Sequence, residues 1–128
     1  MGEYWDVLGE YDAETQAFSA FAGTVASPYS PLVQGTLVGI RIIVNAQAAT
    51  SLTRGVIIRL TCTEWTPNTI QFAVAGNGLK TAPDPIVPTY DFALNLPVKT
   101  DKRITLEGRC IEGTHQTNSI LVLGKFVA

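Results

Sequence analysis

The stretch Gly35-Thr-Leu-Val-Gly-Ile-Arg-Ile-Ile-Val44 decides the fold class of this chain. Side chains of a β-strand point to alternate faces, with a period of two residues. That period divides the stretch into two sets, one made of Val38, Ile40, Ile42 and Val44 and the other of Leu37, Gly39, Arg41 and Ile43. Because both sets are largely apolar, the pattern predicts a central strand that is covered on each side along part of its length.

A second run, Gly55-Val-Ile-Ile-Arg-Leu-Thr-Cys62, has the same character. One of its faces is apolar, and the opposite face mixes apolar and polar side chains. The first comprises Val56, Ile58, Leu60 and Cys62, and the second Ile57, Arg59, Thr61 and Thr63. β-branched residues dominate both runs, as they do on pleated, half-buried surfaces.

Candidate strands recur about every ten residues along the whole chain, separated by turn residues. We expect them at residues 4–11, 16–22, 35–44, 55–65, 70–74, 90–96, 103–111 and 119–127. Residues 13–21 also fit a short helix, but small residues and weak caps favour a strand there. Pro97 is expected to end the sixth strand, since proline cannot donate to a sheet ladder.

The pattern therefore predicts one all-β domain over residues 1–128, an antiparallel two-sheet sandwich of about eight strands. Two long proline-containing connections, residues 23–34 and 81–88, stand where Greek-key crossovers belong. Eight strands in two sheets is the jelly-roll count. Strand order is left open by the sequence.

The composition limits the functions that the chain can have. Charged residues make up 16% of the chain and the net charge is −2, so a general nucleic-acid-binding face is not expected. No apolar run reaches the roughly 18 residues of a membrane helix, and the N-terminus lacks the pattern of a signal peptide. Such scarce charge indicates that part of the surface does not face water.

No motif identifies a catalytic centre, a metal site or a cofactor. Cys62 and Cys110 are expected on strands as buried free thiols, with a cross-strand disulfide as the alternative. His115 is interpreted as a solvated loop residue. The acidic N-terminal segment is interpreted as a solvated edge, with a calcium site as the alternative; its acids are Asp6, Glu10, Asp12 and Glu14. The run 76–78 is interpreted as a turn, because the lysine and helix of a phosphate loop are missing.

Three aromatic residues are candidate ligand or interface positions: Tyr4, Trp5 and Trp65. A carbohydrate-binding module would expose flat rings of this kind on a sheet face or at a loop tip. Trp65, which follows a predicted strand and precedes a turn, fits that role best. Packing in the core or in an interface is nevertheless the favoured interpretation of these rings.

Three stretches carry a resemblance to a known group of proteins: residues 35–44, residues 55–62 and Leu79-Lys-Thr-Ala-Pro-Asp-Pro85. With them, the chain resembles small single jelly-roll structural proteins of viruses. The resemblance implies assembly through loops and edge strands into rings or shells, and location in a virion. The basic arm that contacts a packaged genome is absent, so the resemblance implies an accessory, decoration or self-assembling role.

The function expected from the sequence is thus that of a non-enzymatic structural protein, possessing no cofactor, whose partner is itself. Strands that are apolar on both faces need a second cover, and a neighbouring copy in a cyclic homo-oligomer, a pentamer or trimer, supplies one. The segment around Tyr4, Trp5 and Val7 is expected to add to this by pairing with an adjacent subunit's edge. The alternative function is a carbohydrate- or other ligand-binding β-sandwich module.

Overall fold

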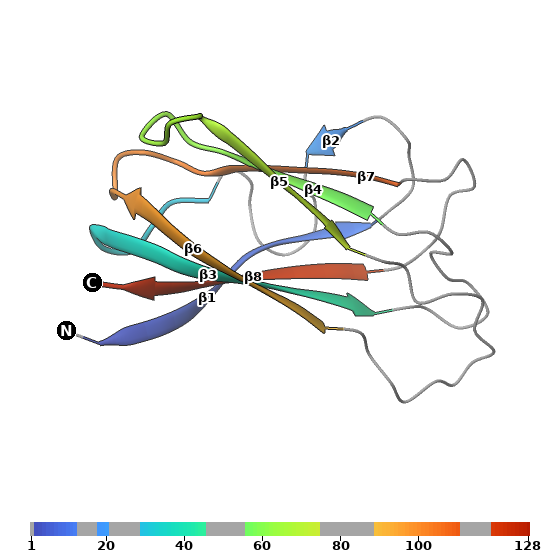
Figure 1. Ribbon diagram of the computed structural model, residues 1–128, viewed down its shortest axis with the longest axis horizontal. Coiled ribbons are helices and arrows are strands. Elements are labelled where there is room, and N and C mark those ends of the chain that lie inside the picture. The colour runs from blue at the N-terminus through green and yellow to red at the C-terminus, as the bar shows by residue number, and fades with distance from the viewer. Residues whose placement is uncertain (1, 13–17, 21–28, 46–55, 75–88, 111–118) are drawn as a thin grey trace.

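The computed structural model describes residues 2–12, 18–20, 29–45, 56–74, 89–110 and 119–128 (Figure 1). Within these residues the chain forms eight β-strands and no helix, as the sequence predicts. The strands are β1 (Glu3–Asp12), β2 (Ser19–Ala20), β3 (Gly35–Asn45), β4 (Val56–Thr61), β5 (Thr69–Val74), β6 (Thr89–Val98), β7 (Thr105–Cys110) and β8 (Ser119–Val127).

The strands form two antiparallel sheets that face each other (Figure 1). Sheet A has the order β1-β8-β3-β6, and sheet B has the order β2-β7-β4-β5. The first strand therefore pairs with the last, the second with the seventh, the third with the sixth and the fourth with the fifth. This nesting is what results when one long hairpin of the whole chain is wound into a two-sheet sandwich. The predicted jelly-roll sandwich is confirmed.

The core lies between the two sheets and is filled by one face of each strand. On β4 the burial alternates strictly, so Val56, Ile58 and Leu60 point inward and Ile57, Arg59 and Thr61 point outward, as predicted. The buried apolar residues are Leu8, Tyr29, Leu37, Ile40, Ile42, Val56, Ile58, Leu60, Cys62, Trp65, Phe72, Val74, Val98, Ile104, Leu106, Ile120, Val122 and Phe126.

The central strand β3 departs from the predicted alternation. Its register with β8 shifts between Leu37 and Gly39, which makes Val38 the extra residue of a β-bulge in that pair. Its register with β6 shifts at the same place in the opposite sense, since two residues of β6, Leu94 and Asn95, lie across from Val38. Because a one-residue insertion flips every later side chain to the other face, Leu37 and Ile40 are both fully buried. The prediction that Leu37 shares a face with Arg41 was therefore wrong, whereas the central position of the strand is confirmed.

The expected end of the sixth strand at Pro97 was also wrong, because β6 continues through Pro97 to Val98. β6 is the last strand of sheet A, and an edge strand tolerates proline where the missing N–H would face away from the sheet. The carbonyl oxygen of Pro97 accepts a hydrogen bond from Trp65 Nε1 at 2.9 Å. Since N–H and C=O of one strand residue point to the same side, the proline nitrogen also faces away from β3.

The fourth strand is shorter than predicted, because it ends at Thr61 rather than at Trp65. The chain then turns, and the Cys62 N–H donates to the Asn68 carbonyl at 2.9 Å before β5 begins. The turn brings Trp65 back into the core, where only 1% of it is exposed. Its indole hydrogen bond to Pro97 ties the β4–β5 turn to the far end of β6.

Cys62 is a buried free cysteine, as expected. Cys110 stands opposite Val56 in the β4–β7 ladder, six residues from Cys62 along β4. A strand rises about 3.3 Å per residue, so the two Cα atoms lie roughly 20 Å apart. A disulfide requires a Cα separation below about 7 Å, so the alternative of a bridge between them is ruled out by the register.

The two tryptophans give a direct test of this core. Replacing Trp65→Ala removes a fully buried ring and leaves a cavity, so we expect a loss of about 3–5 kcal/mol in the free energy of unfolding. Trp5→Ala removes a ring that is 43% exposed, and we expect at most about 1 kcal/mol. Urea unfolding measures both losses. Equal losses for the two variants would contradict the placement of Trp65.

The register also predicts that the chain is insensitive to reductant. Because Cys62 is free and far from Cys110, we expect the same melting temperature with and without a reducing agent. Thermal unfolding followed by circular dichroism measures it. A lower melting temperature under reducing conditions would mean that the two cysteines are bridged.

Candidate functional site

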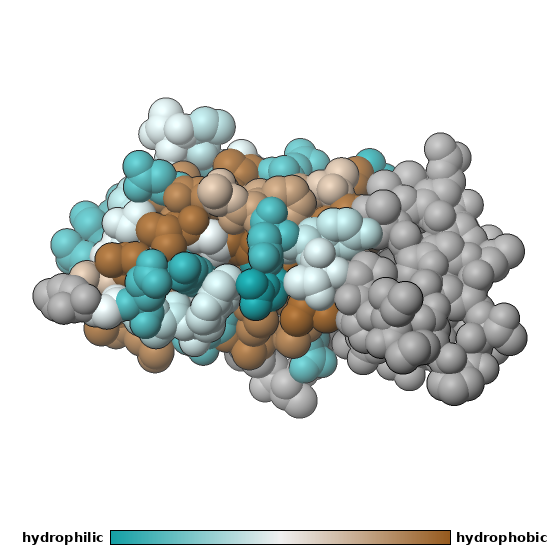
Figure 2. Space-filling model, turned by 60° about the horizontal axis from the view of Figure 1, so that its bottom comes forward, coloured by the Kyte–Doolittle hydropathy of each residue, from teal (hydrophilic) through white to brown (hydrophobic). Residues whose placement is uncertain are grey.

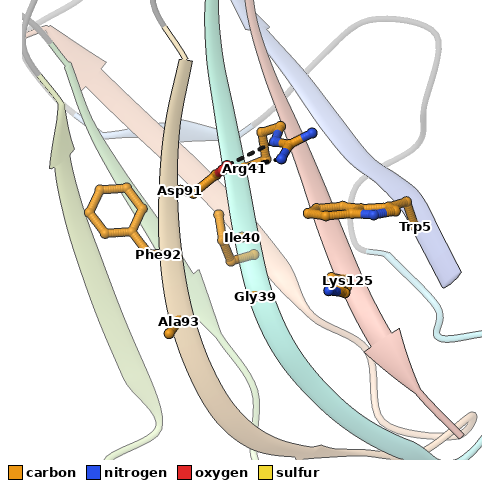
Figure 3. Close-up of a pocket in the computed structure, with 8 residues that line it drawn as sticks. All are labelled: Trp5, Gly39, Ile40, Arg41, Asp91, Phe92, Ala93 and Lys125. Atoms are coloured by element: carbon orange, nitrogen blue, oxygen red, sulfur yellow. Dashed lines mark hydrogen bonds and ion pairs between the residues drawn. The ribbon is translucent and has the colours of Figure 1, made fainter. Parts of the chain in front are cut away.

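Trp5 is a large aromatic residue that is held in the open on the outer face of sheet A. It stands on β1 opposite Lys125 of β8, and its ring reaches across β8 toward β3 (Figure 3). The Arg41 guanidinium lies 4.7 Å from the ring centroid and the Lys125 ammonium 5.8 Å from it. Figure 3 shows the ring edge-on, with Arg41 on one side of its plane and Lys125 on the other. The two cations hold the ring upright on the sheet.

A hollow of about 360 Å³ opens beside this ring (Figure 3). Its floor is formed where Gly39 stands opposite Ala93, since neither residue carries a side chain longer than a methyl group. The lining residues are Trp5, Gly39, Ile40, Arg41, Asp91, Phe92, Ala93 and Lys125. A Cβ atom added at Gly39 would lie 3.7 Å from the Lys125 Cβ atom, an ordinary contact distance. The hollow therefore exists because the residue at 39 is small.

An ion pair closes one side of the hollow. Arg41 Nε donates to Asp91 Oδ1 at 2.8 Å and Arg41 Nη2 donates to Asp91 Oδ2 at 3.1 Å, a two-bond arrangement between neighbouring strands. The hydrogen bond from Arg41 lowers the pKa of the Asp91 carboxyl, and the same bond raises the pKa of the Arg41 guanidinium. Both groups therefore stay charged in neutral solution. Lys125 Nζ lies 3.4 Å from Glu3 Oε1, a looser pair.

The outer face of sheet B carries a related arrangement. Arg59 Nε and Nη2 both donate to Glu107 Oε1, at 3.0 and 2.7 Å. The Arg59 guanidinium lies 3.8 Å from the Phe18 ring centroid. An arginine, a carboxylate and an aromatic ring thus recur on both outer faces.

The sequence-predicted site residues are separated by the structure. Trp5 is exposed, but Tyr4 turns the other way and stacks on Phe126 with ring centroids 5.3 Å apart. Trp65 lies in the core, as the favoured interpretation of these rings expects, and it is not an exposed ligand-binding ring. The physical reason is the turn after Thr61, which folds the indole inward onto Pro97.

Asp6 is partly buried and accepts two hydrogen bonds, whereas a solvated edge was expected. The Tyr29 hydroxyl donates to Asp6 Oδ2, and the Val7 N–H donates to Asp6 Oδ1 at 3.0 Å. Burial first, and then the hydrogen bond to Asp6, raise the pKa of the Tyr29 hydroxyl far above its ordinary value. The Tyr29 ring also stacks on Phe126, so this pair closes one end of the core.

The raised pKa of Tyr29 makes stability fall in alkaline solution. Above about pH 10 the unfolded chain loses the phenol proton while the folded chain keeps it, so the free energy of unfolding decreases as pH rises. We expect the Tyr29→Phe variant to be less stable at neutral pH and to show a shallower alkaline decline. Urea unfolding at a series of alkaline pH values measures both slopes. Identical slopes for the two proteins would contradict this assignment.

Residues that could hold a metal ion do not gather in the described part of the chain. No three His, Cys, Asp or Glu side chains lie together in the ranges given above. His115, Glu14, residues 76–78 and residues 81–88 lie outside those ranges. Nor does any helix among the described residues have the length and apolar character needed to cross a membrane.

Sequence reasoning missed the hollow, although part of its signal was present. Arg41 and Asp91 are charged residues on outward positions of two apolar strands, which marks them as members of an outer face. Their contact depends on the β3–β6 pairing, and the position of Gly39 on that face depends on the bulge. Neither can be read from a single sequence.

A scan against protein-family models finds no match for this chain, and a search of curated proteins finds none either. Solved structures of similar fold include the globular domain of zebrafish complement 1qA protein. That domain has a TM-score of 0.48 and 11% identity, with coverage of 98% of this chain and 95% of the other.

They also include infectious bursal disease virus. The virus-derived T=1 particles have a TM-score of 0.45 and 16% identity, with coverage of 98% of this chain and 31% of the viral one. The Gt strain has a TM-score of 0.42 and 16% identity, with coverage of 98% and 33%. This chain spans about a third of those viral chains. The strand order of the chain itself establishes the fold.

Proposed function

We propose that this chain is a non-enzymatic structural protein that assembles with copies of itself into a closed ring, a trimer or pentamer, as a viral capsid or capsid-associated component. The proposal is supported first by the exposed apolar surface on the β1 side of the sandwich. The jelly-roll fold and the scarcity of charge are consistent with it.

The observation that carries the proposal is the exposure of Leu32 and Val33, of which 66% and 41% are open to solvent. The Val33 backbone lies close enough to the Tyr4 hydroxyl to lower its pKa, against the larger raising effect of burial. Tyr4 belongs to β1, the strand that ends the order of sheet A, so the Val33 backbone lies near that strand. We call Leu32, Val33 and the outer edge of β1 the edge patch. Unpaired strand edges with exposed apolar residues are places where another chain can add.

The outer face of sheet A supplies a second apolar surface. Four residues that point outward are only partly buried: Val7, Ile43, Leu121 and Leu123. Figure 2 shows apolar surface, in brown, running among the charged residues on this side of the molecule. A two-layer sandwich covers one face of each sheet, so this face is available to a neighbour.

Two different surfaces on one chain favour a ring. When the edge patch of one copy meets a different surface of the next, the contact is head-to-tail and closes if the rotation permits. Two interfaces of standard size, each burying about 800 Å² per copy, would cover roughly a quarter of the 6704 Å² accessible surface. The low share of charged residues follows from such coverage.

In this arrangement the segment around Tyr4, Trp5 and Val7 has a more specific role than the sequence suggested. One side of β1 pairs with β8 of the same chain, so only its outer side is offered to a neighbour. The bulge at Leu8 bends this edge. Bulges of that kind restrict the partners that an edge strand accepts.

Sedimentation at micromolar concentration tests the assembly. We expect a single species at three or five times the 13.8 kDa monomer mass, and a shift to monomer in the double variant Leu32→Ser, Val33→Ser. Fully burying side chains of this size contributes about 1.5–3 kcal/mol each, so their loss weakens each interface at least tenfold.

The matched control is Ala73→Ser, an exposed position on β5 at the far edge of sheet B. It should leave the assembled mass unchanged. A wild-type chain that sediments as a monomer would refute the assembly. The alternative function, a ligand-binding module, would then be favoured. Assembly that survives the double variant would refute the edge patch as its contact.

A further inference from the structure

We propose that the hollow beside Trp5 is a binding site for an acidic sugar, a six-membered ring bearing one carboxylate and several hydroxyl groups. The hollow lies on the outer face of sheet A, between Trp5 of β1 and Asp91 of β6. The inference goes beyond self-assembly, because it is argued from the charges and the shape of the hollow itself. It gives the ligand-binding alternative a particular site and a particular chemistry.

The carboxylate is assigned from the charges that converge on the hollow (Figure 3). Asp91 takes two of the five N–H groups of Arg41, which leaves three for a ligand. The Lys125 ammonium is held only loosely, by Glu3 at 3.4 Å. An aromatic ring is negative on its faces and positive at its edge, so the indole edge adds to the positive field of the two cations.

The net charge of the lining indicates a monoanion. Arg41 and Lys125 contribute two positive charges and Asp91 one negative charge. A single carboxylate placed between the two cations neutralises this set. A doubly charged phosphate would leave an excess of negative charge next to Asp91, so it fits less well.

The rest of the ligand is assigned from the size and the floor of the hollow. Its volume of about 360 Å³ lies within the range of roughly 300–1,000 Å³ typical of small-molecule sites, and it far exceeds what a carboxylate alone would fill. The floor at Gly39 and Ala93 carries no side chain longer than a methyl group, which leaves room for a ring above it. The Asp91 carboxylate at the rim can accept hydrogen bonds from ring hydroxyls.

A neutral sugar does not meet the same requirements. Neutral sugars are held in protein sites by stacking on a free aromatic face, whereas the cations Arg41 and Lys125 occupy the two faces of Trp5. The carboxylate is therefore the group that recognition depends on, and the hydroxyls add to it.

Titration of the isotope-labelled full chain with D-glucuronate, followed by amide NMR shifts, tests the site. We expect saturable shifts centred on residues 39–41, 91–93 and 125. D-glucose, which lacks the carboxylate, and acetate, which lacks the ring, should each bind at least about tenfold more weakly. Equal affinity for glucose and glucuronate, or no saturable shift with glucuronate, would overturn the proposal. Tighter binding of glucose 6-phosphate would overturn the monoanion assignment.

Variants separate this site from a general attraction of anions. Gly39→Val raises the floor with a residue that strands favour, and Lys125→Gln removes one cation; each should weaken glucuronate at least about tenfold. If Gly39→Val lowers the melting temperature, Gly39→Ala is the second variant. Its Cβ atom would lie 3.5 Å from the nearest atom, the Phe92 carbonyl oxygen, which is an ordinary contact distance.

The matched control is Arg59→Gln, which breaks an arginine–carboxylate–aromatic arrangement on the opposite sheet and should leave glucuronate affinity unchanged. Loss of binding in Arg59→Gln as well as in Lys125→Gln, with both variants folded, would overturn the site. Sedimentation of the same samples reports the assembled mass separately, so a failure of ligand binding is distinguished from a failure of assembly.

Discussion

The bulge at Val38 is the constraint on which both the core and the outer surface of sheet A depend. One extra residue in β3 lets Leu37 and Ile40 both enter the core, although three positions separate them. The same shift turns Gly39 and Arg41 outward, where they meet Lys125 on one side and Ala93 and Asp91 on the other. An unbulged β3 in the register of Leu37 would expose Ile40 and remove the floor of the hollow.

The outer faces of the two sheets show how a charge-poor chain uses the charges that it has. Arg41 and Arg59 stand on the central strands β3 and β4, and each pairs with a carboxylate on an adjacent strand and lies over an aromatic ring. Cross-strand pairs of this kind favour one register over its neighbours. On sheet A the pair also borders an open hollow, so its charged groups can contact a bound ligand there.

The sequence predicted the elements whose pattern is regular. Strand β4 keeps a strict period of two from Val56 to Thr61, and its two faces were assigned correctly. β8 was predicted with the bounds that the structure has. The errors fall where a local event overrides the period: the bulge in β3, the edge position that lets β6 contain Pro97, and the turn that carries Trp65 into the core. Of the candidate residues, Trp5 was proposed from its residue type alone. Its partners Arg41 and Lys125 can be identified only when the strand order and the register are known.

The register of β3 against β8 and β6 is therefore the most direct point of test. Cross-strand NOEs to the Gly39 backbone protons decide it, because a residue of a central antiparallel strand directs its amide proton toward one neighbouring strand and an α proton toward the other. The account predicts NOEs from Gly39 to Lys125 and to Ala93. NOEs that place Gly39 opposite Gly124 and Val38 opposite Lys125 would mean that β3 has no bulge, and they would contradict both the packing of the core and the site beside Trp5.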